Sequence, residues 1–306
     1  MGDFEKMSLF KRFGRPFAAF GAAAATACGT APAAAPQSAS PAMWKVADHD
    51  TTVYLFGTIH LLPKETKWRS PVFDKAAASA DALVIETNID ESNPGATIGE
   101  LFKLAMSPGL PPIADRVKPE KRAALQTAIA KSGVPAPALD KLETWAAAFL
   151  LLGGQFKDLG LDPGSGVETV LKKQFVASGK PVDQLETNAE QLGFFDRLSE
   201  ASQREFLEGV LEDPATAKGQ FGKMIASWSK GDVKGIADSF NADMGGTPEL
   251  MDALISQRNA NWAKWVKGRL DQPGTVMVAV GAGHLAGDKS LQSLLERQGV
   301  KVTRVQ

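Results

Sequence analysis

Two of the three histidines in this chain stand in the same short pattern, Gly-x-x-His. It occurs at Gly57 and His60 and again at Gly281 and His284, each time directly after an apolar run that is typical of a buried strand. Glu86 directly follows a third such run. A glycine after a strand lets the chain turn sharply, which directs the histidine back over the strand ends. Because open α/β sheets bind ligands beyond the carboxyl ends of their strands, we expect these two imidazoles and this carboxylate to converge.

Two neutral imidazoles and one carboxylate match the ligands of a divalent metal ion such as Zn²⁺, Mn²⁺ or Co²⁺. An open fourth position would hold a water molecule, whose pKa the ion would lower until it became a nucleophile near neutral pH. The alternative is that His60 and His284 are loop residues that cap strand ends, and the spacing alone leaves both interpretations open. His49 lies between two aspartates in a polar turn, so we expect it at the surface.

The elements that must position these residues can be located from the apolar pattern. Strands are predicted at residues 44–46, 52–56, 82–85, 275–280 and 300–305, and a helix at residues 71–80 that begins at Ser70 and Pro71. The strand, helix, strand order of residues 52–85 is a βαβ unit, which implies parallel pairing. The continuous apolar runs suit a sheet that is covered on both faces.

The middle of the chain, from about residue 92 to residue 251, has apolar residues at helical spacing. Helices are predicted at residues 118–131, 142–152, 168–178, 184–211 and 218–230, and a long one follows at residues 251–270. The fold class is therefore mixed α/β, with a split central sheet, flanking helices and a large helical insertion between the two halves of the sheet. Trp145 and Trp228 lie in such helices, and we expect them in the core.

The N-terminus has the pattern of a signal for export. A basic region precedes a short apolar stretch and small residues, and Cys28, the only cysteine, directly follows Ala-Thr-Ala. We expect a signal peptide at residues 1–28 with a lipobox-like cut before Cys28, an Ala/Pro/Ser-rich linker at residues 29–42 and one domain at residues 43–306. The alternative is a plain cut without lipidation, and translation starts at either Met1 or Met7.

Charge and hydropathy limit the partners. The formal net charge is −1 and the pI is near 6.4, so no electrostatic feature favours a nucleic acid as partner. No later window has the apolar length of a membrane-spanning helix, so we expect membrane contact only through the lipid anchor, after export to the periplasm.

Several separated motifs in residues 43–305 resemble the TraB/GumN family. They are Gly-Thr-Ile-His-Leu-Leu-Pro at 57–63, Ala-Leu-Val-Ile-Glu at 82–86, Gly-Val-Glu at 166–168, Leu-Glu-Thr at 185–187 with Gln191, Arg-Asn at 258–259 and Val-Ala-Val-Gly-Ala-Gly-His-Leu at 278–285. The family is related to the Tiki metalloproteases and, more distantly, to erythromycin-esterase-like proteins. The Tiki branch is described as metal-dependent peptidases, whereas the GumN-like branch carries a label linked to polysaccharide synthesis.

Residue by residue, the resemblance implies a core site of His60, Glu86 and His284. It adds Glu168 and Glu186 as further acids, each a ligand or a general base, and Glu86 itself is a candidate catalytic carboxylate.

The resemblance also implies a role for the Arg-Asn pair. Arg258 either stabilises a developing oxyanion or forms a structural salt bridge with one of the acids. Asn259, Gly57 and Gly281 are expected to surround and orient the core residues.

The sequence thus predicts an exported metal-dependent hydrolase that cleaves a peptide or another small substrate. The alternative is an envelope-associated binding protein that keeps the fold without catalysis. Should the site hold no metal, an esterase-like mechanism with His60 or Glu86 as the base takes its place.

Overall fold

The computed structural model describes residues 39–64, 66–88, 102–107, 109–156, 163–244 and 247–306, together with the single positions Gly99 and Leu161. Cys28 and the predicted signal peptide lie outside these residues. The last residues of the predicted linker are described and pack on the domain. Ala39 and Ala42 are buried, and the backbone N–H groups of Ala39 and Ser40 donate to the carbonyls of Lys67 and Ser229.

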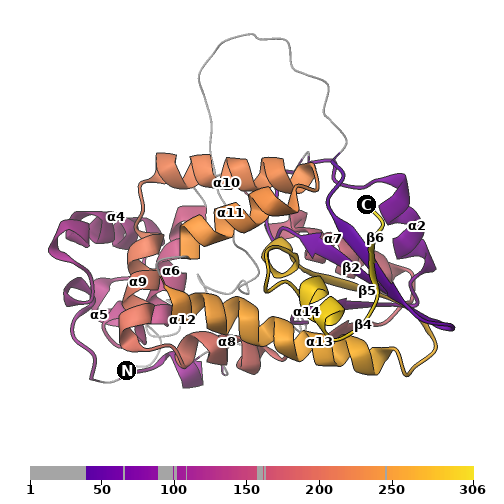
Figure 1. Cartoon of the computed structure of the whole chain (residues 1–306). Coiled ribbons are helices and arrows are strands. Elements are labelled where there is room, and N and C mark those ends of the chain that lie inside the picture. Colours follow the sequence, from indigo (N-terminus) through magenta and orange to yellow (C-terminus); the bar gives the residue numbers. More distant parts are fainter. Residues whose placement is uncertain are drawn as a thin grey trace, which may run out of the picture.

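A six-stranded mixed sheet forms one side of the described structure (Figure 1). Its order is β4-β3-β5-β2-β1-β6. The strands are β1 (Met43–Ala47), β2 (Thr51–Thr58), β3 (Ala82–Ile85), β4 (Val182–Gln184), β5 (Gly274–Gly281) and β6 (Val302–Arg304). β4, β3, β5 and β2 run parallel to one another, whereas β1 is antiparallel to both of its neighbours, β2 and β6. The three strands that carry the predicted site residues therefore lie in one sheet, as the sequence predicted.

The βαβ unit of β2, α2 (Pro71–Ser79) and β3 is parallel as predicted, but its two strands are not neighbours. β5, from the far end of the chain, lies between them and pairs with both. Ser70 caps α2 by accepting a hydrogen bond from the N–H of Phe73, as its position in the sequence predicted.

Helices cover both faces of the sheet, which explains why its central strands are apolar throughout. On one face α2 and α7 (Val167–Ala177) pack on the side chains of Phe56, Leu83 and Met277. On the other face α13 (Gln257–Arg269) and α14 (Leu291–Arg297) pack on the alternate residues of the same strands. Because successive side chains of each strand point to opposite faces, they pack into two separate cores.

The helical insertion has a core of its own, to the left of the sheet in Figure 1. Its main elements are η1 (Ile113–Asp115), η2 (Pro119–Lys121), α4 (Arg122–Ser132), α5 (Ala136–Leu139), α6 (Thr144–Phe156) and α9 (Glu200–Val210). Trp145 is completely buried there, and Trp228 is buried under the sheet, so both lie in cores as expected.

The remaining elements lie between the insertion and the sheet in sequence or directly follow β5. They are η4 (Pro163–Ser165), α8 (Asn188–Asp196), α10 (Pro214–Ser229), α11 (Val233–Met244), α12 (Pro248–Met251), the π-helical turn η5 (Asp252–Ser256) and the 3-10 turn η6 (Ala282–Leu285). Within the described part of the chain, no helix is both long and apolar enough to cross a membrane.

The single helix predicted at residues 184–211 is wrong. The structure has the end of β4 there, then α8 and then α9. Thr187 starts α8 with a capping box, in which its side chain accepts from the N–H of Glu190 and the carboxylate of Glu190 accepts from the N–H of Thr187. Ser199 starts α9 by accepting a hydrogen bond from the N–H of Ser202. The apolar spacing continues across both helices, so it did not reveal that these two caps start separate helices.

Candidate functional site

The carboxyl ends of β2, β3 and β5 bring His60, Glu86 and His284 together. Gly281 marks the meeting point, because a Cβ atom built on it would lie 3.2 Å from Oε1 of Glu86, 3.6 Å from Nε2 of His60 and 3.8 Å from Cδ2 of His284. The N–H of Gly281 also donates to Oε1 of Glu86 over 2.7 Å. His60 and His284, which are more than 200 positions apart in sequence, therefore face one small space. It lies at the carboxyl edge of the sheet, as expected from the strands that precede these residues.

Glu168, in the first turn of α7, orients His60. Nδ1 of His60 lies 2.7 Å from Oε1 of Glu168, and the hydroxyl of Thr58 donates to the same oxygen. The start of α7 is held against the end of β2, because the N–H of Val167 donates to the carbonyl of Ile59. Gly166 is required for this approach, since a Cβ there would lie 2.0 Å from the carbonyl oxygen of His60. His60 thus has one ring nitrogen fixed and keeps Nε2 for the space at Gly281.

His284 is held by the Arg-Asn pair of α13. Its Nδ1 lies 2.7 Å from Oδ1 of Asn259, and its Nε2 lies 2.9 Å from Nη1 of Arg258. A guanidinium can only donate, so Nε2 accepts and the ring proton is on Nδ1, which donates to Asn259. Burial, followed by the positive charge of Arg258, lowers the pKa of His284 to about 3. His284 is therefore a neutral imidazole whose free electron pair already accepts a hydrogen bond.

Arg258 joins the two remaining acids. Its Nη2 lies 2.5 Å from Oε2 of Glu86 and 2.5 Å from Oε1 of Glu186, and its Nε donates to Glu186 over 2.9 Å. Glu186 reaches this position because the backbone pairing between β3 and β4 extends past the ends of both strands. There the N–H of Glu186 donates to the carbonyl of Glu86. Nε2 of Gln191 donates to both carboxylates over 3.2 Å. Of the two roles predicted for Arg258, the structure thus contains the ion pair with the acids.

Burial alone would raise the pKa of Glu86, but the charge of Arg258, with the two histidines, outweighs it and holds that pKa well below its usual range. Burial raises the pKa of Glu186, and Arg258 only partly offsets that effect. The carboxylate of Glu168 raises the pKa of His60 to about 9, against the opposing effect of burial. The groups form an alternating row of charges in the order Glu168, His60, Glu86, Arg258 and Glu186.

The fit of a metal ion can be tested against this geometry. Both histidines have Nδ1 held by a neighbouring side chain, which is common for metal ligands. An ion about 2.0–2.2 Å from each ligand would place the ligand atoms within about 4.4 Å of one another. Nε2 of His284 lies 3.9 Å from Oε1 of Glu86, but the three predicted ligands do not form such a group together, and Arg258 already donates to Nε2 of His284. In this arrangement, His60, Glu86 and His284 do not fit one ion bound by all three of them. The metal site therefore stays a prediction.

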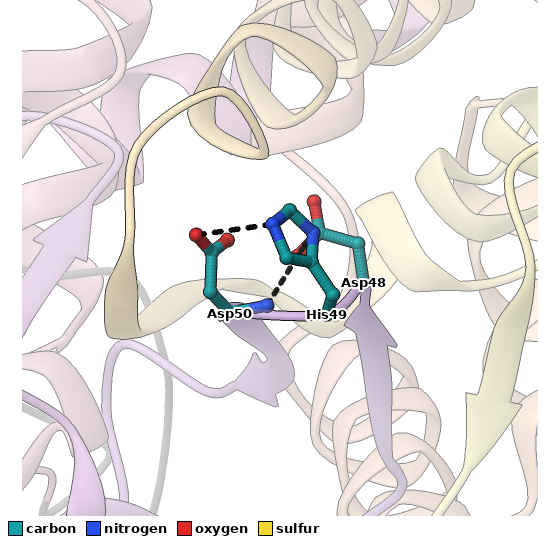
Figure 2. A group of neighbouring side chains, drawn as sticks. All are labelled: Asp48, His49 and Asp50. Atoms are coloured by element: carbon teal, nitrogen blue, oxygen red, sulfur yellow. Dashed lines mark hydrogen bonds and ion pairs between the residues drawn. The ribbon is translucent and has the colours of Figure 1, made fainter.

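Among the described residues, only Asp48, His49 and Asp50 bring three possible ligand atoms within 4.8 Å of one another (Figure 2). They form the turn between β1 and β2, so they lie at the opposite end of β2 from His60. The side chain of His49 is 86% exposed, and its Nε2 lies 3.3 Å from Oδ2 of Asp50. His49 is thus a surface residue, as the sequence predicted.

The structure adds three residues to those singled out in the sequence. Thr58 and Gln191 bind the acids of the site, and Gly166 allows α7 to approach His60. All three lie inside motifs that carried the family resemblance, so the resemblance could have pointed to them as site residues. Gly57, predicted to support the site, allows a close approach to the turn that carries His284, since a Cβ there would lie 3.3 Å from Cα of Ala282.

Comparison with known proteins agrees with the motifs. The model of the TraB/PrgY/gumN family matches residues 42–304. The "Uncharacterized protein YbaP" of Escherichia coli (strain K12) is 25% identical over 247 residues, which cover 79% of this chain and 87% of the relative, and the protein of the same name from Shigella flexneri gives the same figures. No solved structure gives a significant match. Because the family model spans most of the sequence, this chain belongs to the TraB/PrgY/gumN family.

Proposed function

We propose that this protein hydrolyses an acyl bond, of the peptide or ester kind, at the carboxyl edge of its sheet, with His60 as the general base. The contact between His60 and Glu168 carries the proposal. Nδ1 of His60 lies 2.7 Å from Glu168, while the ring is 45% exposed and Nε2 faces the space at Gly281. A histidine oriented by a carboxylate, with its second nitrogen open, is the arrangement that general-base catalysis needs.

The reaction can be followed atom by atom. At a pH near or above its pKa of about 9, His60 is neutral and takes a proton from water at Nε2, and the water oxygen forms a bond to the carbonyl carbon of the substrate. The electron pair of the C=O bond moves to oxygen, which becomes an oxyanion. When this intermediate collapses, the bond to the leaving nitrogen or oxygen breaks, and the leaving group takes the proton back from His60.

Glu86 is the weaker choice of base. Its pKa lies well below the usual range, because Arg258 and the two histidines favour its charged form. A carboxylate held in this way accepts a proton poorly. Its role in the proposal is to face His60 across the space at Gly281 and to hold Arg258.

The test compares turnover of the full chain on fluorogenic peptides and activated esters with that of His60→Ala. General-base catalysis typically contributes about 10²–10⁴-fold, so we expect His60→Ala to lose activity by that factor. His49→Ala, which removes an exposed histidine, is the matched control and should keep full activity. Equal turnover by wild type and His60→Ala would overturn the proposal. Tight substrate binding without turnover would instead favour the envelope-associated binding protein.

We also propose that the protein is exported and held to a membrane through a lipid on Cys28. The support is the order of the basic region, the apolar stretch and the single cysteine after Ala-Thr-Ala. Labelled fatty acid should be incorporated by the wild type and not by Cys28→Ala. Export of an unlabelled wild-type protein would reject the anchor and leave plain secretion.

A further inference from the structure

Arg258 uses all five of its N–H groups inside the site. Nε and one N–H of Nη2 donate to Glu186, the other N–H of Nη2 donates to Glu86, and Nη1 donates to the carbonyl of Leu254 and to Nε2 of His284. Its guanidinium carbon also lies 4.7 Å from the ring centre of Trp262. Arg258 is therefore fixed from several sides.

The atoms of His284 and Glu86 that accept these hydrogen bonds are also the atoms that would bind a metal ion. A neutral imidazole with its proton on Nδ1 has one electron pair, on Nε2, and in His284 this pair accepts from Arg258. One oxygen of Glu86 accepts from Arg258 and the other accepts from the N–H of Gly281. Both residues, like Arg258 and Glu186, are 4–8% exposed, so solvent does little to screen their charges.

We infer that Arg258 is the resident cation of this site and excludes a divalent metal ion from the position between Glu86 and His284. A guanidinium remains charged at every pH at which proteins fold, so this cation never leaves by losing a proton. The inference concerns binding alone and holds whether or not the protein is a hydrolase. It differs from what the resemblance to the Tiki metalloproteases implies for this chain.

The inference has a consequence for the arginine-free site. Removal of the guanidinium leaves two buried carboxylates side by side, together with an imidazole whose electron pair is free. Carboxylate oxygens and imidazole nitrogens are good ligands for first-row divalent ions. Arg258→Met should therefore create the metal site that the wild type lacks.

The first experiment uses the full wild-type chain. It is equilibrated with Co²⁺, passed through a desalting column, and examined by elemental analysis and by the visible absorption of bound Co²⁺. We expect no stoichiometric metal and no spectrum that depends on His284. One ion per chain that disappears in His284→Ala would overturn the inference. The measurement is repeated with His49→Ala, so that weak binding at the exposed turn of Asp48, His49 and Asp50 is not mistaken for the site.

The second experiment compares variants. Arg258→Met should bind Co²⁺ more tightly than the wild type by about tenfold or more, a change of the size that the surroundings of a metal site typically cause. Arg197→Met is the matched control. Arg197 is exposed and stacks on Phe194, the ring that Arg258 also faces, but it lies outside the ion pairs, so it should gain nothing.

Arg258→Met on its own leaves two like charges buried and can fail to fold. The double variant Arg258→Met/Glu186→Gln removes one charge of each sign and keeps His60, Glu86 and His284. It should fold and gain Co²⁺ binding, and its melting temperature should rise when Co²⁺ is added. A folded double variant that binds Co²⁺ no more tightly than the wild type would also overturn the inference.

Discussion

Glu168 controls the charge of His60, and this gives a prediction for the pH dependence of the rate. Glu168→Gln keeps a hydrogen-bond acceptor but removes the negative charge that raises the pKa of His60 to about 9. His60 acts as a base only when neutral, so the rate rises with pH through this pKa. In the variant the rise should move to lower pH by about two units, the effect expected from the loss of one neighbouring charge.

The measurement is kcat/KM between about pH 5 and pH 10, with an NMR titration of the His60 ring as a second readout. Asp50→Asn is the matched control, because it removes the carboxylate beside the exposed His49. It should leave the profile unchanged. A profile of Glu168→Gln that coincides with that of the wild type would contradict the proposed role of Glu168.

Gly281 gives a second prediction at the scale of one residue. Gly281→Ala places a methyl group about 3.2 Å from Oε1 of Glu86 and 3.6 Å from Nε2 of His60, while the backbone φ of −49° suits alanine. We expect the variant to fold and to lose turnover by about 100-fold, because the methyl group occupies the space that the substrate carbonyl needs. Gly268→Ala, on α13 with no atom near its Cβ position, should keep full turnover. Full activity of Gly281→Ala would show that the reaction takes place elsewhere.

At the scale of elements, the strands that lead to the site could be predicted because their apolar runs are continuous. β4 could not, because its three residues are half-buried or exposed and have no apolar pattern. The missed strand matters for the site, because β4 places Glu186 beside Glu86. The contact of Arg258 with both acids was likewise invisible, because β4 and α13 meet only in the folded chain, and the sequence motif allowed two roles for the arginine.

The helical insertion depends on a second buried arginine. Arg116 is 1% exposed and donates to the backbone carbonyls of Pro111, Asp140 and Leu142, so it joins the segment before η1 to the start of α6. Arg116→Met should lower the free energy of unfolding by roughly 3 kcal/mol, because it leaves buried carbonyls without a donor.

Urea unfolding followed by circular dichroism measures this effect. Arg122→Met is the matched control in the same insertion, because Arg122 is exposed and forms its ion pair with the exposed Asp115. Its loss should change the free energy of unfolding by about 0.5 kcal/mol or less. Equal effects of the two substitutions would mean that the carbonyls around Arg116 find other donors.

At the scale of the whole molecule, His284 makes stability depend on pH. Its pKa is about 3 in the folded chain and near 6.5 in the unfolded chain, so the unfolded chain binds the proton first as the pH falls. The contribution of His284 to stability should therefore be complete above about pH 6.5 and should fall below it, by about 2 kcal/mol at pH 5. His60, whose pKa is raised in the folded chain, acts in the opposite direction. Most carboxylates titrate below this window, and comparison with a variant that lacks His284 separates its contribution from that of His60.

His284→Gln should remove most of this dependence, although it lowers stability at neutral pH because Arg258 loses an acceptor. His49→Gln is the control and should keep the wild-type slope, since His49 is exposed. The free energy of unfolding at about pH 7 and pH 5 is compared for the three proteins. An unchanged slope in His284→Gln would mean that His284 is protonated in the folded state.

The place of β5 between β2 and β3 has a consequence for how the protein is made. A ribosome completes β3 at Ile85 and reaches β5 only at Gly274, so the central strand is synthesised long after the strands on both sides of it. At about 5–20 residues per second this delay is roughly 10–40 s. The helical insertion, with its own core, can assemble during this interval, whereas β2 and β3 must wait without their shared partner. The candidate site is therefore incomplete until β5 and η6 have been made, and His60 and Glu86 meet His284 only after that point.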